Sequence, residues 1–119
     1  MEGLPEEALA QVAAYFQALS EPTRLQILNL LRQQERSVGE LAQLCGHSSA
    51  NISRHLALLT QHGLVARESR GNSAIYSIAD KSVYALCDLV CGSIARQFER
   101  IAQERAAFVA PATKRARAR

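Results

Sequence analysis

The sequence contains no tryptophan, few aromatic residues and no long hydrophobic run. Its apolar stretches are much shorter than the roughly 20 residues of a membrane-spanning helix, so we expect no membrane segment. The acidic start MEGLPEEALAQ lacks the basic and apolar regions of a secretory signal. The three cysteines are an odd number and cannot all pair within one chain. Together these absences predict a protein of the reducing cytoplasm.

At 119 residues, of which 48% are hydrophobic, the chain is long enough for one packed domain. We expect this domain to span residues 1–108 and a basic, disordered tail to span 109–119, where four basic residues stand without an acidic one. The tail is either a solvated run of charge or an arm that touches DNA. The rest of the chain carries one net negative charge, so overall basicity is weak evidence for a nucleic-acid partner.

The first part of the chain carries the signals of two helices. Pro5 and the two acidic residues after it open the first helix, and Ser20-Glu21-Pro22 opens the second. The first helix has one apolar stripe. The second has leucine and isoleucine pointing in several directions, which predicts that it is buried nearly all round.

Two further helices are predicted around a tight turn. Ser37 and Glu40 form a capping box that starts a third helix. Gly46 can adopt the positive φ of a turn, Ser48 caps a fourth helix, and Gly63 ends it.

A hairpin and a long helix are predicted to follow. Residues 64–69 and 74–78 alternate like strands and flank a Gly-Asn pair typical of a two-residue turn. Asp80 then caps a helix that reaches about Phe108. The apolar stripe of that helix consists of Val83, Cys87, Val90, Ile94, Phe98 and Ile101. A small domain cannot cover so long a stripe, so we expect this helix to have a partner.

Helix, tight turn, helix and hairpin form a winged helix-turn-helix, a mainly α fold with a small β-hairpin wing. A helix that enters the major groove needs short polar groups near its start and an outer face outside the core. On the fourth helix, the candidate DNA-binding residues are Ser48, Ser49, Asn51, Ser53, Arg54 and His55. On the wing they are Arg67, Arg70 and Asn72. We expect Asn51 and Arg54 to read bases and the wing to contact the backbone or minor groove of double-stranded DNA.

These segments resemble the ArsR/SmtB family over roughly residues 15–95. The resemblance is carried by LSEPTRLQIL from Leu19, VGELA from Val38, ISRHLALL from Ile52 and GLV from Gly63. It implies a homodimeric repressor that dimerises through its first and last helices and binds operator DNA. It also implies an inducer, often a metal or metalloid ion, that lowers the affinity for DNA.

The best-known inducer sites of the family do not carry over to this chain. Where some members have a Cys-Val-Cys arsenic site, this chain has Ser37-Val38-Gly39. Where others have a zinc site of Asp, His, His and Glu, this chain has Asp80, Ser82, Ser93 and Arg96.

The last helix offers Cys87 and Cys91 instead, four residues apart and therefore on one helical face. Two thiolates there could converge on a soft ion, and we expect trivalent arsenic or antimony because zinc usually takes four ligands. A third sulfur could come from Cys45 or from the partner chain.

Other interpretations stay open. Cys87 and Cys91 could be core residues, or could sense oxidants or sulfane sulfur. The chain could also be a protein-interaction adaptor without an inducer. The sequence has no Ser/His/Asp set, paired carboxylates or phosphate loop, so we expect neither an enzyme nor an organic cofactor.

Overall fold

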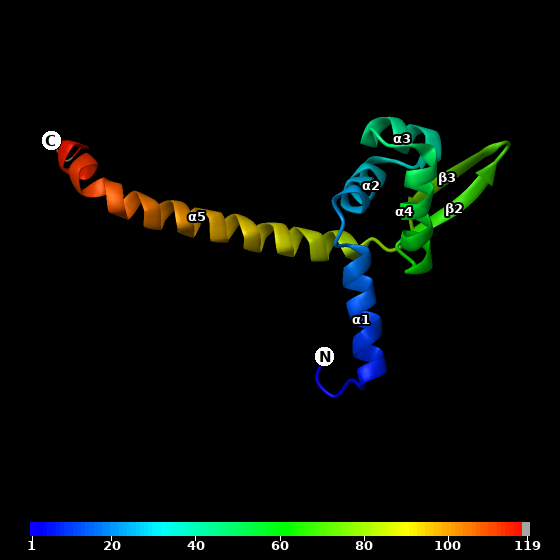
Figure 1. Cartoon of the computed structure of the whole chain (residues 1–119), viewed down its shortest axis with the longest axis horizontal. Helices are drawn as coiled ribbons and strands as arrows, with labels where there is room; N and C mark the ends of the chain where they lie inside the picture. The colour runs from blue at the N-terminus through cyan, green and yellow to red at the C-terminus, as the bar shows by residue number, and fades with distance from the viewer. Residues whose placement is uncertain (118–119) are drawn as a thin grey trace. The chain divides into compact units, whose positions relative to one another are not determined.

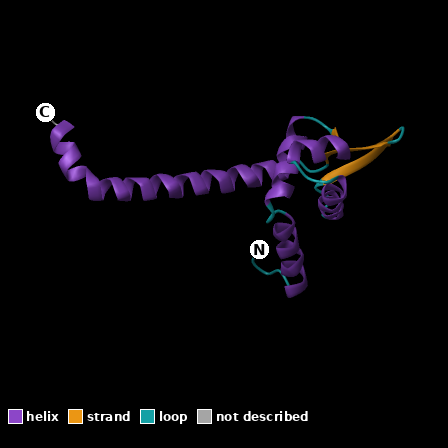
Figure 2. Cartoon of the chain, turned by 45° about the horizontal axis from the view of Figure 1, so that its top comes forward, coloured by secondary structure: helices purple, strands orange, loops and turns teal. Residues whose placement is uncertain are grey.

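The computed structural model describes residues 1–117. The elements, in chain order, are α1 (Glu6–Ala18), α2 (Pro22–Gln33), β1 (Arg36–Ser37), α3 (Val38–Cys45), α4 (Ser49–Gln61), β2 (Val65–Arg70), β3 (Ser73–Ile78) and α5 (Ser82–Arg117) (Figure 1). They form two compact units, Met1–Lys81 and a second that begins at Ser82 and consists of α5. The predicted fold class is confirmed: the chain is mainly helical with a small antiparallel sheet (Figure 2). Among the described residues, no helix combines the length and apolarity needed to cross a bilayer.

Local capping sets the limits of α3 and α4, as predicted. The Ser37 hydroxyl accepts from the Glu40 amide (N to Oγ, 3.1 Å), and the Glu40 carboxylate accepts from the Ser37 amide (N to Oε1, 3.0 Å). The Ser48 hydroxyl caps α4. Gly46 and Gly63 follow these helices with φ of 70° and 72°, a conformation that costs glycine least.

The core of the first unit lies among α2, α3, α4 and the sheet. Its fully buried side chains are Ile27, Leu41, Ile52, Leu56, Leu59 and Leu64. The prediction that α2 is buried nearly all round is wrong, because Leu25 on its outer side is 41% exposed. The core therefore holds α2 by one face and leaves the other to solvent or a partner.

The wing is the β2–β3 hairpin, which extends beyond the helices of its unit (Figure 1). Val65 pairs with Ile78 and Arg70 with Ser73, so Gly71-Asn72 forms the predicted two-residue turn. The sequence did not indicate β1, which pairs antiparallel with β3 and makes the strand order β1-β3-β2. Two residues are too few to show an alternating pattern.

Helix α5 forms the second unit and runs to Arg117, beyond the end predicted near Phe108. The Ala-, Glu- and Arg-rich residues 99–107 are mostly strong helix formers, and Ala, Lys and Arg continue the helix beyond Phe108 in spite of Pro111. The segment 109–119, predicted to be a disordered tail, therefore has helical backbone up to Arg117, and its last two residues lie outside the described part.

Candidate nucleic-acid interface

Helix α4 separates a core face from an outer polar face. Ile52, Leu56 and Leu59 are buried, whereas Ser53 and Arg54 are exposed. This is the division that a groove-reading helix requires, because side chains that hold the core cannot also reach base edges.

The start of α4 offers backbone donors. The Ser48 hydroxyl is occupied by the Asn51 amide (N to Oγ, 3.1 Å), and the Ser48 carbonyl accepts from the Ile52 amide (3.1 Å). The amides of Ser49 and Ala50 precede these two and point outward at the positive end of the helix dipole. They can hold a phosphate without disturbing the cap.

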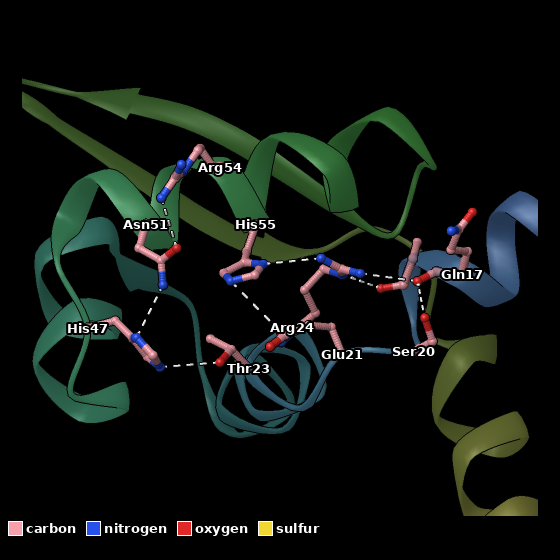
Figure 3. A network of polar contacts seen from close by, with 10 residues as sticks. Gln17, Ser20, Glu21, Thr23, Arg24, His47, Asn51, Arg54 and His55 are labelled. Atoms are coloured by element: carbon pink, nitrogen blue, oxygen red, sulfur yellow. Dashed lines mark hydrogen bonds and ion pairs between the residues drawn. The ribbon is translucent and has the colours of Figure 1, made fainter.

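Polar contacts connect the proposed base-reading side chains to the body of the unit (Figure 3). Arg54 donates from Nη2 to Asn51 Oδ1 (3.2 Å), and Asn51 Nδ2 lies 3.1 Å from His47 Nδ1. His47 Nε2 lies 3.2 Å from the Thr23 hydroxyl on α2. The structure thus brings together Asn51 and Arg54, the two candidates for base readout. Sequence alone predicts a solvated His47 in the turn and assigns no role to Thr23, because their contact joins residues 24 positions apart.

His55 lies beneath the outer face of α4. Its side chain is 15% exposed, and its Nε2 lies 3.9 Å from Glu21 Oε2. Its Nδ1 lies 3.2 Å from Arg24 Nη1. An arginine can only donate, so this Nδ1 accepts and the imidazole is neutral. Burial lowers the pKa of His55, Glu21 opposes this, and Arg24 adds to it. The predicted DNA contact of His55 stays a prediction, and its contacts with Arg24 of α2 and with Glu21, the N-cap of that helix, were not expected.

Arg24 joins three elements of the unit. Its Nε donates to the Ala18 carbonyl oxygen (2.6 Å), and its Nη2 donates to the Gln17 carbonyl oxygen (3.1 Å). These carbonyls lie at the end of α1, where helix carbonyls lack partners within the helix. With the bond to His55, the guanidinium connects α1, α2 and α4 (Figure 3).

The wing arginines already have partners in the protein. Arg67 Nη1 donates to the Ser69 hydroxyl (3.2 Å). Arg70 forms ion pairs with Glu35 and with Glu68 (Nη2 to Oε2, 2.8 Å). The hydrogen bond from Arg70 holds the pKa of Glu35 below its usual range. The predicted phosphate contact of Arg70 therefore requires a carboxylate to be exchanged for a phosphate, whereas Asn72 is exposed in the turn.

The cysteines lie on two units. Cys45 ends α3 half-buried, and burial raises the pKa of its thiol. On α5, Cys87 is half-buried and Cys91 is exposed, and none of the three is in a disulfide. In the part of the chain that the structure describes, no three His, Cys, Asp or Glu side chains are grouped to hold a metal ion. A site that includes Cys45 stays a prediction.

A polar helix behind a tight turn, followed by a charged hairpin, defines a winged helix-turn-helix DNA-binding protein. Residues 21–67 match the family model described as bacterial regulatory protein, arsR family. The uncharacterized HTH-type transcriptional regulator Rv0081 of Mycobacterium tuberculosis is 40% identical over 85 residues, which are 71% of this chain and 75% of that protein. The chain belongs to the ArsR family of transcriptional regulators.

Solved structures agree. The crystal structure of Rv0081 has a TM-score of 0.74 at 36% identity and covers 81% of this chain and 97% of that one. The solution structure of a homodimeric winged helix-turn-helix DNA-binding domain from Mycobacterium bovis has a TM-score of 0.71 at 35% identity. The match covers 84% of this chain and 95% of that domain. A more distant relative, a probable mercury resistance operon repressor of Streptomyces lividans, is 35% identical over 71 residues, 60% of this chain and 57% of that protein.

Proposed function

We propose that this regulator is a cytoplasmic homodimeric repressor that releases its operator when a trivalent metalloid, arsenite or antimonite, binds the Cys87 and Cys91 thiolates. The observation that carries the proposal is the pair of thiols on one face of α5, one of them exposed and the other half-buried. The similarity to a probable mercury resistance repressor supports a soft, thiophilic ion as the inducer, because mercury and trivalent arsenic both favour thiolate ligands.

Exposed apolar side chains support the dimer. On α5, Ile94 is 45% and Phe98 67% exposed, and on α1 Phe16 is 49% exposed. Large apolar side chains repeated along one helix mark a surface that a partner covers. The related M. bovis domain is homodimeric. We therefore assign the interface to α1 and α5 of two copies.

The dimer links the thiols to DNA. Two recognition helices must lie about 34–36 Å apart to enter successive major grooves, so a change of dimer geometry weakens binding. A bound ion shifts this equilibrium only by its different affinity for the two geometries. A coupling of about 1–3 kcal/mol lowers DNA affinity roughly 5- to 150-fold. Thiols lose their protons on binding, so inducer affinity rises with pH.

The test is DNA binding by the purified dimer, measured by fluorescence anisotropy on an operator selected from random DNA. Arsenite and antimonite should release the wild type, and zinc should not. Cys87→Ser and Cys91→Ser should bind DNA normally and ignore both metalloids. Cys45→Ser is the matched control and loses the response only if it supplies a third sulfur. Release of the Cys87→Ser/Cys91→Ser double variant by metalloid refutes the proposal.

A second function is favoured by the exposure of Cys91, which leaves its thiol open to oxidants. In this alternative, peroxide or sulfane sulfur modifies the thiol and releases the operator. A disulfide between residues four apart strains a helix, so such a bond requires α5 to unwind locally. Release by peroxide, with no response to arsenite, supports this alternative over the metalloid sensor.

Sequence readout is assigned to Asn51 and Arg54, with Arg67, Arg70 and Asn72 of the wing on the backbone or minor groove. Asn pairs with adenine and Arg with guanine in the major groove. Arg54→Ala should cost about 1–3 kcal/mol on operator DNA and relax the base preference. Unchanged specificity in that variant would mean that α4 does not read the operator through Arg54.

A further inference from the structure

Four side chains from three parts of the first unit form one hydrogen-bonded series. It begins at Thr23 on α2, passes through His47 in the α3–α4 turn, and ends at Asn51 and Arg54 on α4 (Figure 3). Thr23 is buried, whereas Arg54 is exposed. The series thus joins the core side of the unit to the pair assigned to base readout.

The direction of every bond follows from the arginine. A guanidinium can only donate, so the Asn51 atom that faces Arg54 is the carbonyl Oδ1. The Asn51 amide must then present its NH₂ to His47, and His47 Nδ1 must accept. The imidazole proton is left on Nε2, which donates to the Thr23 hydroxyl. One arrangement of hydrogens satisfies all three contacts, and it requires a neutral His47.

We propose that His47 and Thr23 are positioning residues for sequence recognition. They fix which edge of the Asn51 amide faces outward and, through Asn51, where the Arg54 guanidinium lies before DNA arrives. A side chain held in its binding orientation loses less conformational freedom on binding, and this advantage is realised only at bases that it matches. The inference rests on the proposed readout by Asn51 and Arg54.

The arrangement is sensitive to the charge of His47. A protonated imidazole donates from both nitrogens, so Nδ1 can no longer accept from the Asn51 NH₂. The amide must turn its oxygen to His47, which removes the acceptor from Arg54.

The experiment measures the ratio of Kd for unrelated DNA to Kd for the selected operator, at one salt concentration and pH 7.5. His47→Ala and Thr23→Val should lower this ratio roughly two- to tenfold, the effect of one net hydrogen bond, with Kd for unrelated DNA unchanged. His47→Gln should restore the ratio, since a neutral amide both donates and accepts. Gln43→Ala, an exposed substitution on α3, is the matched control.

The outcomes separate this inference from the proposed readout. If Asn51→Ala and Arg54→Ala leave the ratio unchanged, the readout is wrong. If they lower it and His47→Ala does not, only the positioning role is wrong. Should His47→Ala fail to fold, Thr23→Val and His47→Gln decide: the ratio should fall in Thr23→Val and stay at the wild-type value in His47→Gln. An unchanged ratio in Thr23→Val refutes the positioning role.

Discussion

Arg24→Ala should destabilise the first unit through a defined set of lost contacts. The guanidinium donates to the Ala18 and Gln17 carbonyls and to His55. Gln17 keeps other donors, since the Ser20 amide and hydroxyl also reach its carbonyl (3.1 and 2.7 Å). The Ala18 residue is buried, and its carbonyl accepts from Arg24 alone among the described residues. The substitution therefore leaves one buried acceptor unpaired.

The loss of stability in Arg24→Ala can be estimated from the contacts that the substitution removes. An unpaired buried acceptor costs about 1–3 kcal/mol, and each of the two other hydrogen bonds contributes about 0.5–1.5 kcal/mol. Partial overlap and rearrangement reduce the sum, so we expect the free energy of unfolding to fall by about 2–4 kcal/mol. Arg24→Lys should recover little of this loss, because a lysine has one donor group and cannot reach three acceptors in different directions.

Urea unfolding followed by circular dichroism at 222 nm measures the effect. Protein concentration must be the same for all variants, because the apparent stability of the proposed dimer depends on it. Gln26→Ala, an exposed change on the same helix, should stay within about 0.5 kcal/mol of the wild type. If Arg24→Ala is as stable as Gln26→Ala, the guanidinium does not stabilise the junction of α1 and α4, and the reasoning fails.

Three further predictions concern residues of the first unit, Met1–Lys81. Burial lowers the pKa of His55 in the folded protein, so the imidazole binds a proton more readily in the unfolded chain. The free energy of unfolding should therefore fall as the pH drops below about 6.5. Urea titrations at several pH values should show a weaker pH dependence for His55→Gln. Leu56→Ala should cost about 2–5 kcal/mol, whereas Leu25→Ala on the outer side of α2 should cost much less; equal losses would place the core elsewhere. Glu35→Gln removes a carboxylate that competes with DNA phosphates for Arg70. The variant should bind any DNA roughly 1.5- to 5-fold more tightly in anisotropy titrations. Weaker binding would mean that the ion pair holds the wing in its DNA-binding shape.

The elements that sequence predicted correctly depend on short-range chemistry. Three local features were predicted correctly: the Ser37–Glu40 capping box, the positive φ of Gly46 and the Gly71-Asn72 turn. Each depends on residues within a few positions of one another, so the sequence pattern alone indicates it. The split of α4 into core and outer faces follows from helical periodicity for the same reason.

The features that sequence did not indicate depend on contacts across the fold. His55 and Arg24 are 31 positions apart, and Arg70 and Glu35 are 35 apart. The sequence indicates that His55 and Arg70 are suited to contact DNA. Only the tertiary structure shows that both already interact with other side chains of the protein. The end of α5 differs from the prediction for another reason: Pro111 and the basic residues after it favour a helix end near Phe108, whereas the backbone is helical up to Arg117.

The order β1-β3-β2 has a consequence for solubility. It makes β2 an edge strand, whose outer backbone groups have no strand partner among the described residues. Such an edge invites strands of other molecules to add to the sheet. Beyond its first residue, β2 exposes every side chain, and Arg67, Glu68 and Arg70 are among them. Alternating charges make edge-to-edge pairing unfavourable, so the residues suited to DNA also keep wings of neighbouring molecules apart at high concentration.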